Sequence, residues 1–318
     1  MTWGKNNLLL KKPVLIDGIS RSGKSILSGI IPSLKNAEQI KFYTYFEHII
    51  PALSFKSINL DYAKTQIRLE LNELAYNTFL GRNVNLRHKE QTSLNNQPHK
   101  KNYIKRFKQK EGEKIVKQLN KTKNFFPFQT HELMPNIKYL NSLNINHKII
   151  EIYRDPIDNI YSWIRLEWGK RFSEDQRSFT LNKFNKKNKK NFPWFCSGYE
   201  NHWFNLNNYE KCAFSVCDLI ERSVKAQKSN KYKSRVLTLS FENFYINPNQ
   251  NLKRICRFLK TEKTSYTKNE LVKARCPRKE NLNDRKNKEN FIRDRVSRKI
   301  FNKIMSIQYS YNKNLYGL

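Results

Sequence analysis

The stretch Gly18-Ile-Ser-Arg-Ser-Gly23-Lys24-Ser25 decides the fold class of this chain. A short apolar run at 13–17 precedes it, and apolar residues return at helical spacing from 26 to 31, which indicates a strand, a loop and a helix. The stretch matches the GxxxxGK[ST] pattern, in which glycines let consecutive backbone N–H groups surround an anion at a helix N-terminus. An accidental glycine-rich turn is the alternative. We predict a phosphate-binding loop, with Arg21 and Lys24 as mobile cations.

The rest of the chain alternates short apolar runs with segments of helical spacing. Strands are expected at 125–129, 148–153 and 236–240, and helices at 63–79, 136–143, 213–227 and 250–259, with a further helix that Asp155 caps and Pro156 opens. Strands that alternate with helices are typical of a parallel sheet covered on both faces. The sequence therefore predicts an α/β, P-loop-type three-layer fold, with a central parallel sheet flanked by helices.

The chain has 318 residues, enough for one large α/β domain. We predict a single domain over residues 1–318, with variable basic insertions near 83–124 and 171–208. Within the second insertion, residues 171–193 are typical of a mobile loop. We find no internal repeat.

The chain is strongly basic, with 61 Lys and Arg against 27 Asp and Glu, a formal net charge of +34 and an isoelectric point near 10.0. Such a field attracts nucleic acid, anionic glycans or phosphorylated small molecules, and it does not choose among them. Lys, Asn, Ile, Phe and Tyr are over-used together, which also fits a compositional bias. A basic nucleic-acid-binding protein is one alternative, although no zinc-finger or RRM signature is present.

Cysteine usage and the N-terminus bear on the compartment. The five cysteines form no CxxC pair and are odd in number, which favours neither a disulfide framework nor a zinc site. The apolar run near the N-terminus is too short for a signal peptide, and no stretch approaches 18 apolar residues. We expect a soluble, cytoplasmic protein without a membrane span.

A phosphate loop alone does not identify its nucleotide, so an ATP- and Mg²⁺-dependent P-loop kinase is a second alternative. That class needs a hydrophobic strand ending in an Asp that positions Mg²⁺. The clearest later strand, 148–153, is followed by Arg154, with Asp155 next, and Asp17 precedes the loop. Lys24 and Ser25 keep the kinase alternative open.

Arg154 follows a strand directly, and Ser162 lies about two turns into the next helix. Both side chains could face one anion at the carboxyl edge of the sheet, although a salt bridge with an N-cap would explain the arginine too. Here the sequence resembles the sulfotransferase family, whose second cofactor motif is a strand, an Arg and a Ser eight residues later that hold a 3′-phosphate. The spacing of Arg154 and Ser162 matches.

Three further stretches follow the order of that family. Residues 128–135 resemble its Lys-Thr-His segment with Gln129 replacing the lysine, 237–259 resemble its strand, loop and helix, and 278–287 resemble its Arg-Lys-Gly loop. In the last stretch Glu280 replaces the glycine and Arg285 a tryptophan. In the phosphate loop Lys24 replaces a threonine. The resemblance spans roughly residues 13–290, in separated islands.

The resemblance implies a sulfotransferase that moves a sulfuryl group from 3′-phosphoadenosine-5′-phosphosulfate (PAPS) to a hydroxyl or amine acceptor, leaving 3′,5′-adenosine bisphosphate (PAP), with a glycan as one candidate acceptor. His131 would be the base, with Glu132 as a fallback, and Arg21 and Lys24 would stabilise the leaving phosphate. No metal is expected to be required. The nucleotide-binding residues it implies are Arg21, Ser22, Gly23, Lys24, Ser25, Arg154, Ser162, Arg278 and Lys279.

The acceptor site is expected among the variable segments, where aromatic residues accompany many lysines. Aromatic faces with cations suit sugars or anionic glycans, and ordinary core packing is the equally strong alternative. The aromatic candidates are Trp168, Trp194, Phe195, Tyr199 and Trp203.

Overall fold

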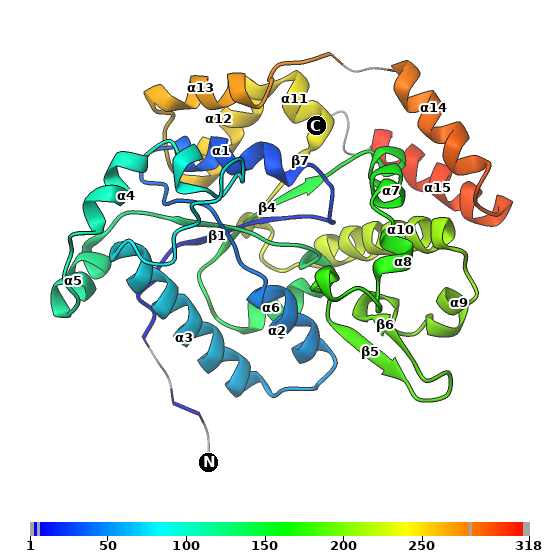
Figure 1. Cartoon of the computed structure of the whole chain (residues 1–318), viewed down its shortest axis with the longest axis horizontal. Helices are drawn as coiled ribbons and strands as arrows, with labels where there is room; N and C mark the ends of the chain where they lie inside the picture. Colours follow the sequence, from blue (N-terminus) through cyan, green and yellow to red (C-terminus); the bar gives the residue numbers. More distant parts are fainter. Residues whose placement is uncertain (1–2, 5–6, 280–281, 314–318) are drawn as a thin grey trace.

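The central element is a parallel sheet of five strands in the order β2-β3-β1-β4-β7 (Figure 1). The computed structural model describes residues 3–4, 7–279 and 282–313 of the chain. The strands are β1 (Pro13–Asp17), β2 (Lys41–Phe42), β3 (Phe126–Gln129), β4 (Lys148–Tyr153) and β7 (Val236–Ser240). The predicted α/β fold with a parallel sheet flanked by helices is confirmed.

Strand β1 lies in the middle of the sheet, and all five of its residues are buried. Burial on both faces explains its continuous apolar run, because a parallel sheet carries helices on either side. The register pairs Ile16 with Gln129 of β3 and with Ile150 of β4. The carboxyl ends of these three strands therefore open at the same edge, where the phosphate loop begins.

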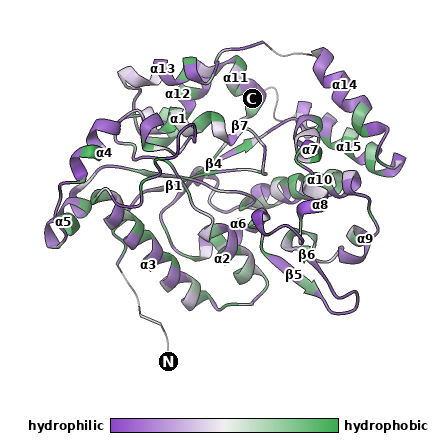
Figure 2. Cartoon of the chain, in the orientation of Figure 1, coloured by the Kyte–Doolittle hydropathy of each residue, from purple (hydrophilic) through white to green (hydrophobic). Residues whose placement is uncertain are grey.

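Two hydrophobic layers cover the sheet, and β1 alternates between them. Leu15 packs with apolar residues of α2 (Tyr45–Ser54), α3 (Leu60–Phe79), α5 (Glu113–Lys121) and α6 (Ile137–Ser142). Val14 and Ile16 pack with the opposite layer, from α1 (Leu27–Ile30) and α12 (Pro248–Leu259). Figure 2 shows hydrophobic residues on the strands between these layers.

A third cluster lies beside the sheet, where α7 (Pro156–Arg165), α10 (Asn208–Lys228) and α15 (Arg298–Tyr311) pack together. Trp163 of α7 is fully buried there. Figure 1 shows these helices gathered on the side of the sheet where β4 ends. This cluster supports the start of α7, which lies next to Arg154.

The predicted strands match the observed ones within a residue, and each predicted helix overlaps an observed one, whereas several helices were not predicted. The helix after the phosphate loop is short, because α1 is flanked by the 3₁₀ turns Lys24–Ile26 and Ile31–Ser33 and a proline enters at Pro32. The further helices are α4 (Lys100–Arg106), α8 (Trp168–Arg171), α9 (Glu200–Phe204), α11 (Phe241–Ile246), α13 (Ser265–Lys273) and α14 (Leu282–Arg293).

Both basic segments contain regular structure. Residues 83–124 include α4 and α5, and residues 171–208 include α9 and an antiparallel hairpin of β5 (Asn182–Asn185) and β6 (Lys190–Pro193). The expectation of a mobile loop at 171–193 is therefore wrong, because residues 182–193 form a hairpin. Its two strands pair up to Asn185 and Lys190, on either side of a short polar turn.

Candidate active site

The phosphate loop has a shape that its two glycines allow. Gly18 and Gly23 adopt φ angles of 142° and 90°, which disfavour residues with a side chain. A Cβ at Gly18 would lie 2.3 Å from the Ile152 carbonyl oxygen, and one at Gly23 would lie 2.2 Å from the Phe241 ring. Both positions therefore require glycine for backbone conformation and for close packing.

Two side chains from other elements hold the middle of the loop. The Ser20 N–H donates to Glu132 Oε1 at 2.7 Å, and the Trp163 indole N–H donates to the Ser20 carbonyl at 2.7 Å. Glu132 follows β3 and Trp163 lies on α7, so the loop is braced from both sides. The fallback base Glu132 thus has one oxygen engaged with the loop backbone, and burial raises the pKa of its carboxyl.

Lys24 is turned inward. Its ammonium donates to the carbonyls of Gly18 at 2.6 Å and Ile19 at 2.9 Å, and the residue is 3% exposed. Burial lowers the pKa of Lys24, while four nearby carboxyl groups oppose that shift. Lys24 was expected to be a mobile cation, but in this structure it is buried, because its ammonium is held by the loop's own carbonyls and attracted by the carboxyl groups. Those carboxyl groups belong to Asp17, Glu47, Glu132 and Glu151.

Arg21, Arg154 and Ser162 meet at one point above the sheet edge. Arg21 Nε donates to Ser162 Oγ at 3.0 Å, and Arg154 Nη1 donates to the Arg21 carbonyl at 3.0 Å. Arg21 itself has a left-handed φ of 68°, which turns its side chain toward α7. Burial, and then the nearby Arg154 cation, lower the pKa of Arg21. The arginine and serine that the eight-residue spacing singled out are thus joined through Arg21, which contacts both.

A cavity of about 690 Å³ opens between the loop and the segments around it. Six of its lining residues are Lys or Arg and one is Glu, so the cavity suits a multiply charged anion. Arg278 reaches it with its guanidinium 4.5 Å from the Tyr245 ring centre and 5.4 Å from that of Phe241. The basic residues are Arg21, Lys24, Lys89, Arg154, Lys273 and Arg278, and the acidic one is Glu270.

The remaining expected nucleotide contacts differ in their placement. Gly23 and Ser25 line the cavity. The Ser22 hydroxyl is buried, with no hydrogen-bond partner among the described residues. Lys279 is exposed and is not among the lining residues. Glu280, which replaces a glycine of the resembled loop, lies outside the described residues.

His131 lines the cavity beside the loop, at the carboxyl end of β3. Its Nδ1 lies 3.0 Å from Glu47 Oε1 on α2. Burial and the Lys24 cation lower the pKa of His131 to about 4, so the imidazole is neutral at physiological pH. A neutral imidazole can accept a proton, as a general base must.

Several residues of the site were not predicted. Phe241, Glu270 and Lys273 line the cavity and lie in the C-terminal half, where residue type alone carries no signal. Glu47 contacts His131 without lining the cavity, and it lies in a segment without a recognisable motif. Lys89 and Gln91 belong to the basic segment 83–124, which was expected to lie near the acceptor.

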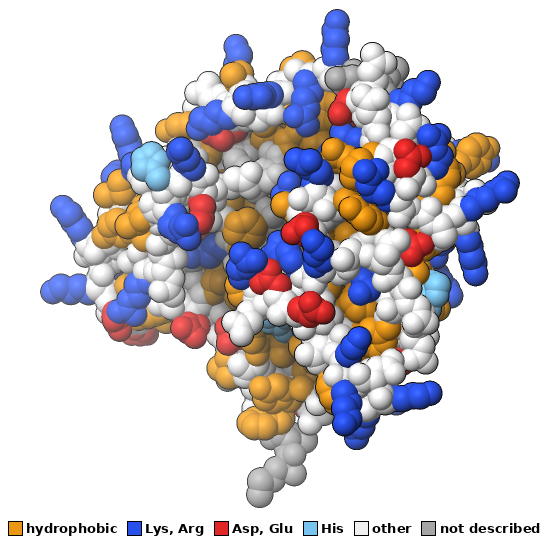
Figure 3. All heavy atoms as spheres, turned by 45° about the vertical axis from the view of Figure 1, so that its right-hand side comes forward, with side chains coloured by type: hydrophobic (Ala, Val, Ile, Leu, Met, Phe, Trp, Pro, Cys, Tyr) orange, Lys and Arg blue, Asp and Glu red, His pale blue; other side chains and the backbone are white. Residues whose placement is uncertain are grey.

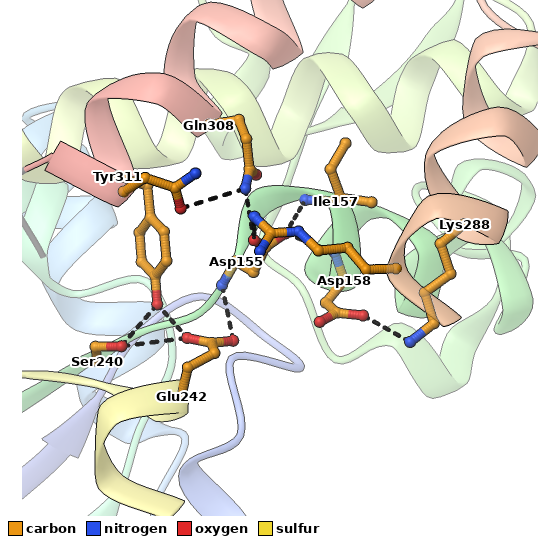
Figure 4. A network of polar contacts seen from close by, with 10 residues as sticks. Asp155, Ile157, Asp158, Ser240, Glu242, Lys288, Gln308 and Tyr311 are labelled. Atoms are coloured by element: carbon orange, nitrogen blue, oxygen red, sulfur yellow. Dashed lines mark hydrogen bonds and ion pairs between the residues drawn. The ribbon is translucent and has the colours of Figure 1, made fainter. Parts of the chain in front are cut away.

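A buried polar network ties the C-terminal helices to the end of β4 (Figure 4). Asp155 caps α7 by accepting from the Ile157 and Asp158 N–H groups, and it also accepts from Gln308 of α15 at 2.6 Å. Arg285 of α14 pairs with Asp155 as well. The position that follows Arg154 is therefore held by two later helices.

The family model described as the sulfotransferase domain matches residues 11–300. The chain belongs to the sulfotransferase domain family. It is a sulfotransferase, and the match favours neither the P-loop kinase nor the nucleic-acid-binding alternative. Figure 3 shows Lys and Arg side chains of this sulfotransferase spread over the visible face rather than gathered in one patch.

Solved structures similar to the sulfotransferase include other sulfotransferases. The sulfotransferase domain from the curacin biosynthetic pathway is 13% identical, with 83% of this chain and 77% of that chain covered and a TM-score of 0.44. A sulfotransferase from Alicyclobacillus acidocaldarius is 15% identical, with coverages of 93% and 95% and a TM-score of 0.36. Retinol dehydratase in complex with retinol and PAP is 14% identical, with coverages of 98% and 83% and a TM-score of 0.34. No curated protein matches the chain.

The aromatic residues proposed for the acceptor site of the sulfotransferase are mostly core residues, which corrects that expectation. Trp194, Phe195 and Trp203 are buried in the cluster around α7 and α10, because the hairpin and α9 fold over that cluster. Tyr199 is exposed, and Trp168 lines the cavity.

Other expectations concern metals, membranes and cysteines. Over the described ranges, no three His, Cys, Asp or Glu side chains gather as a metal site would require. None of the helices in those ranges is both long and apolar enough to span a membrane. All five cysteines are free.

Proposed function

We propose that this sulfotransferase takes the sulfuryl group from PAPS, passes it to a hydroxyl or amine of an acceptor, and releases PAP. The observation that carries this proposal is the meeting of Arg21, Arg154 and Ser162 next to the phosphate loop, with Arg278 lining the same cavity as Arg21 and Arg154. PAPS carries phosphate at both the 5′ and the 3′ position. A loop for one phosphate and an arginine cluster beside it for the other match that arrangement.

In this proposal the two phosphates have separate partners. The backbone of the loop, with Ser22, Gly23, Lys24 and Ser25, holds the 5′-phosphate, because N–H groups at a helix start favour an anion. The 3′-phosphate is bound by Arg154, Ser162 and Arg278, and the resemblance adds Lys279.

The proposed chemistry needs few protein groups. His131 takes the proton of the acceptor as the acceptor's oxygen or nitrogen bonds to sulfur, and the bond between sulfur and the bridging oxygen breaks at the same time. The electron pair of that bond stays on the 5′-phosphate of PAP. Arg21 opposes the growing charge there, and so does Lys24 once its ammonium leaves the Gly18 and Ile19 carbonyls. We propose that this reaction needs no metal, since these cations supply the charge stabilisation.

The acceptor side of the proposal rests on polarity. Lys89, Gln91, Asn96 and Trp168 line the cavity together with His131. Amide, ammonium and indole groups suit a hydrophilic acceptor, and a glycan remains one candidate. We also propose that residues 1–318 act as one domain, and that the protein works in a reducing, cytoplasmic setting where its cysteines stay free.

Thermal unfolding with PAP, with ADP, and with ATP and Mg²⁺ tests the donor, at matched ligand and salt concentrations. We expect the largest rise in midpoint with PAP, a small one with ADP, and loss of the PAP effect in Arg154→Ala. Arg165→Ala is the matched control, because Arg165 is an exposed arginine on α7. A preference for ATP with Mg²⁺ would overturn the proposal and favour a kinase.

A further inference from the structure

His131 and Glu47 form a pair across two elements of the site. Glu47 lies in the first turn of α2, and His131 follows β3, with His131 Nδ1 and Glu47 Oε1 3.0 Å apart. The side chain of Glu47 is 16% exposed and that of His131 is 26% exposed. His131 lines the cavity and Glu47 does not, so Glu47 lies behind the imidazole as seen from the cavity.

The two ring nitrogens of His131 have different surroundings. Nδ1 contacts Glu47, whereas Nε2 makes no hydrogen bond to any described residue. An imidazole has one protonated and one bare nitrogen when it is neutral, and the partner of one nitrogen decides the state of the other. A carboxylate at Nδ1 therefore leaves Nε2 bare and able to take a proton.

We propose that Glu47 is a positioning residue, whose carboxylate accepts a hydrogen bond from Nδ1–H of His131 and so keeps Nε2 available to the acceptor. This inference rests on the proposed function, in which His131 is the base. Glu47 touches neither donor nor acceptor, and it acts by fixing the orientation and the tautomer of the ring.

The charges around the pair make the tautomer depend on pH. The charges of Asp17 at the end of β1, Lys24 of the loop and His48 of α2 act on Glu47, while those of Lys24, Asp17 and Glu132 act on His131. Burial, and then the Asp17 charge, raise the pKa of Glu47 to about 8. Below that pH the protonated Glu47 donates to Nδ1, which moves the ring proton to Nε2 and removes the base. Above it, the carboxylate restores the productive tautomer.

Nitrogen-15 spectra of the histidine-labelled full chain, recorded with saturating PAP, test the tautomer directly. In the wild type we expect the Nδ1-protonated form of His131 to increase as pH rises through about 8 or somewhat higher, since the bound anion opposes ionisation of Glu47. Glu47→Gln should lose this pH dependence, and Glu47→Asp should keep it in part. Glu113→Gln is the matched control, since Glu113 is an exposed carboxylate in the first turn of α5.

Turnover gives an independent readout that needs no identified acceptor. Release of PAP from PAPS with water as the acceptor transfers the sulfuryl group to the water oxygen. One water proton goes to His131, and the hydrogen sulfate formed loses the other to solvent, giving sulfate. At a pH above that of Glu47 ionisation, where the wild type holds the productive tautomer, we expect Glu47→Gln to lower kcat by about 10- to 100-fold, with KM for PAPS and PAP affinity unchanged within about twofold.

The outcomes separate the two proposals. If the wild type does not bind PAP, the proposed function fails. If PAP binds to both proteins, and Glu47→Gln leaves the tautomer of His131 and its pH dependence as in the wild type, the role of Glu47 is refuted. Retained PAP binding by Glu47→Gln shows that the variant is folded. If the variant does not fold, the pH titration of the His131 tautomer in the wild type tests the proposal by itself.

Discussion

Tyr311 on the last helix donates its hydroxyl to Glu242, and the other oxygen of Glu242 accepts the N–H of Asp155 at 3.1 Å (Figure 4). Asp155 directly follows Arg154 in the chain. The C-terminal helix α15 is thereby connected, through one buried carboxylate, to the backbone that carries an arginine of the proposed 3′-phosphate site.

Tyr311→Phe should weaken this connection. Glu242 would keep Ser240 and Asp155 as partners and lose one buried hydrogen bond, which costs about 1–2 kcal/mol of unfolding free energy. We expect PAP binding to weaken by less than in Arg154→Ala. Urea unfolding and PAP titration measure the two effects. Tyr309→Phe is the control, because Tyr309 is 69% exposed on the same helix, and an equal loss of stability there would contradict the prediction.

Gly23→Ala should abolish PAP binding. The added Cβ would lie 2.2 Å from the Phe241 ring, in a backbone with φ of 90°. Gly198 has a φ of 91° with no atom within 4 Å of such a Cβ, so Gly198→Ala carries the backbone strain without the clash. We expect that control to cost about 1–2 kcal/mol and to bind PAP normally. Calorimetric titration decides, and comparable binding by the two variants would contradict the packing argument.

Lys24→Met should destabilise the protein as well as reduce turnover. Its ammonium is the buried partner of the Gly18 and Ile19 carbonyls, and removal leaves buried carboxyl groups without that cation. Losing one partner of a buried charged cluster costs about 3–5 kcal/mol. Lys35→Met removes only an exposed pair with Glu262 and should change stability by less than about 1 kcal/mol. Denaturant unfolding distinguishes them, and equal midpoints would refute a structural role for Lys24.

The pH dependence of stability should report Asp155. Burial raises the pKa of Asp155 to about 7 in the folded protein, from an ordinary value of 3.8. The folded state therefore holds this proton more tightly than the unfolded chain, so its contribution is full below pH 4 and is lost as pH rises through about 7. Relative to the wild type, Asp155→Asn should gain stability across that window. Denaturant unfolding of both proteins at each pH measures this. A difference in unfolding free energy between Asp155→Asn and the wild type that stays constant from pH 4 to 8 would show that Asp155 keeps an ordinary pKa.

The strands and the phosphate loop were predictable from local pattern. Each of β1, β3, β4 and β7 is a mostly apolar run, and the loop is a contiguous motif whose glycines have conformations that few other residues adopt. Strand β2 has two residues and carries no such signal. The polar helix α14 has no strong apolar periodicity, so its docking on α7 through Lys288 and Asp158 could not be inferred.

The sequence by itself determined the loop, the strand order along the chain and the spacing of Arg154 and Ser162, because these depend on residues that are close in the chain. The tertiary structure alone decided that Lys24 points inward and that Glu47 lies against His131. It also decided that Trp194 and Trp203 belong to the core. The contact of Glu47 with His131, the carboxyl groups around Lys24 and the burial of Trp194 and Trp203 all bring together segments far apart in the chain. They follow from how the helices pack around the sheet rather than from any local pattern of residues.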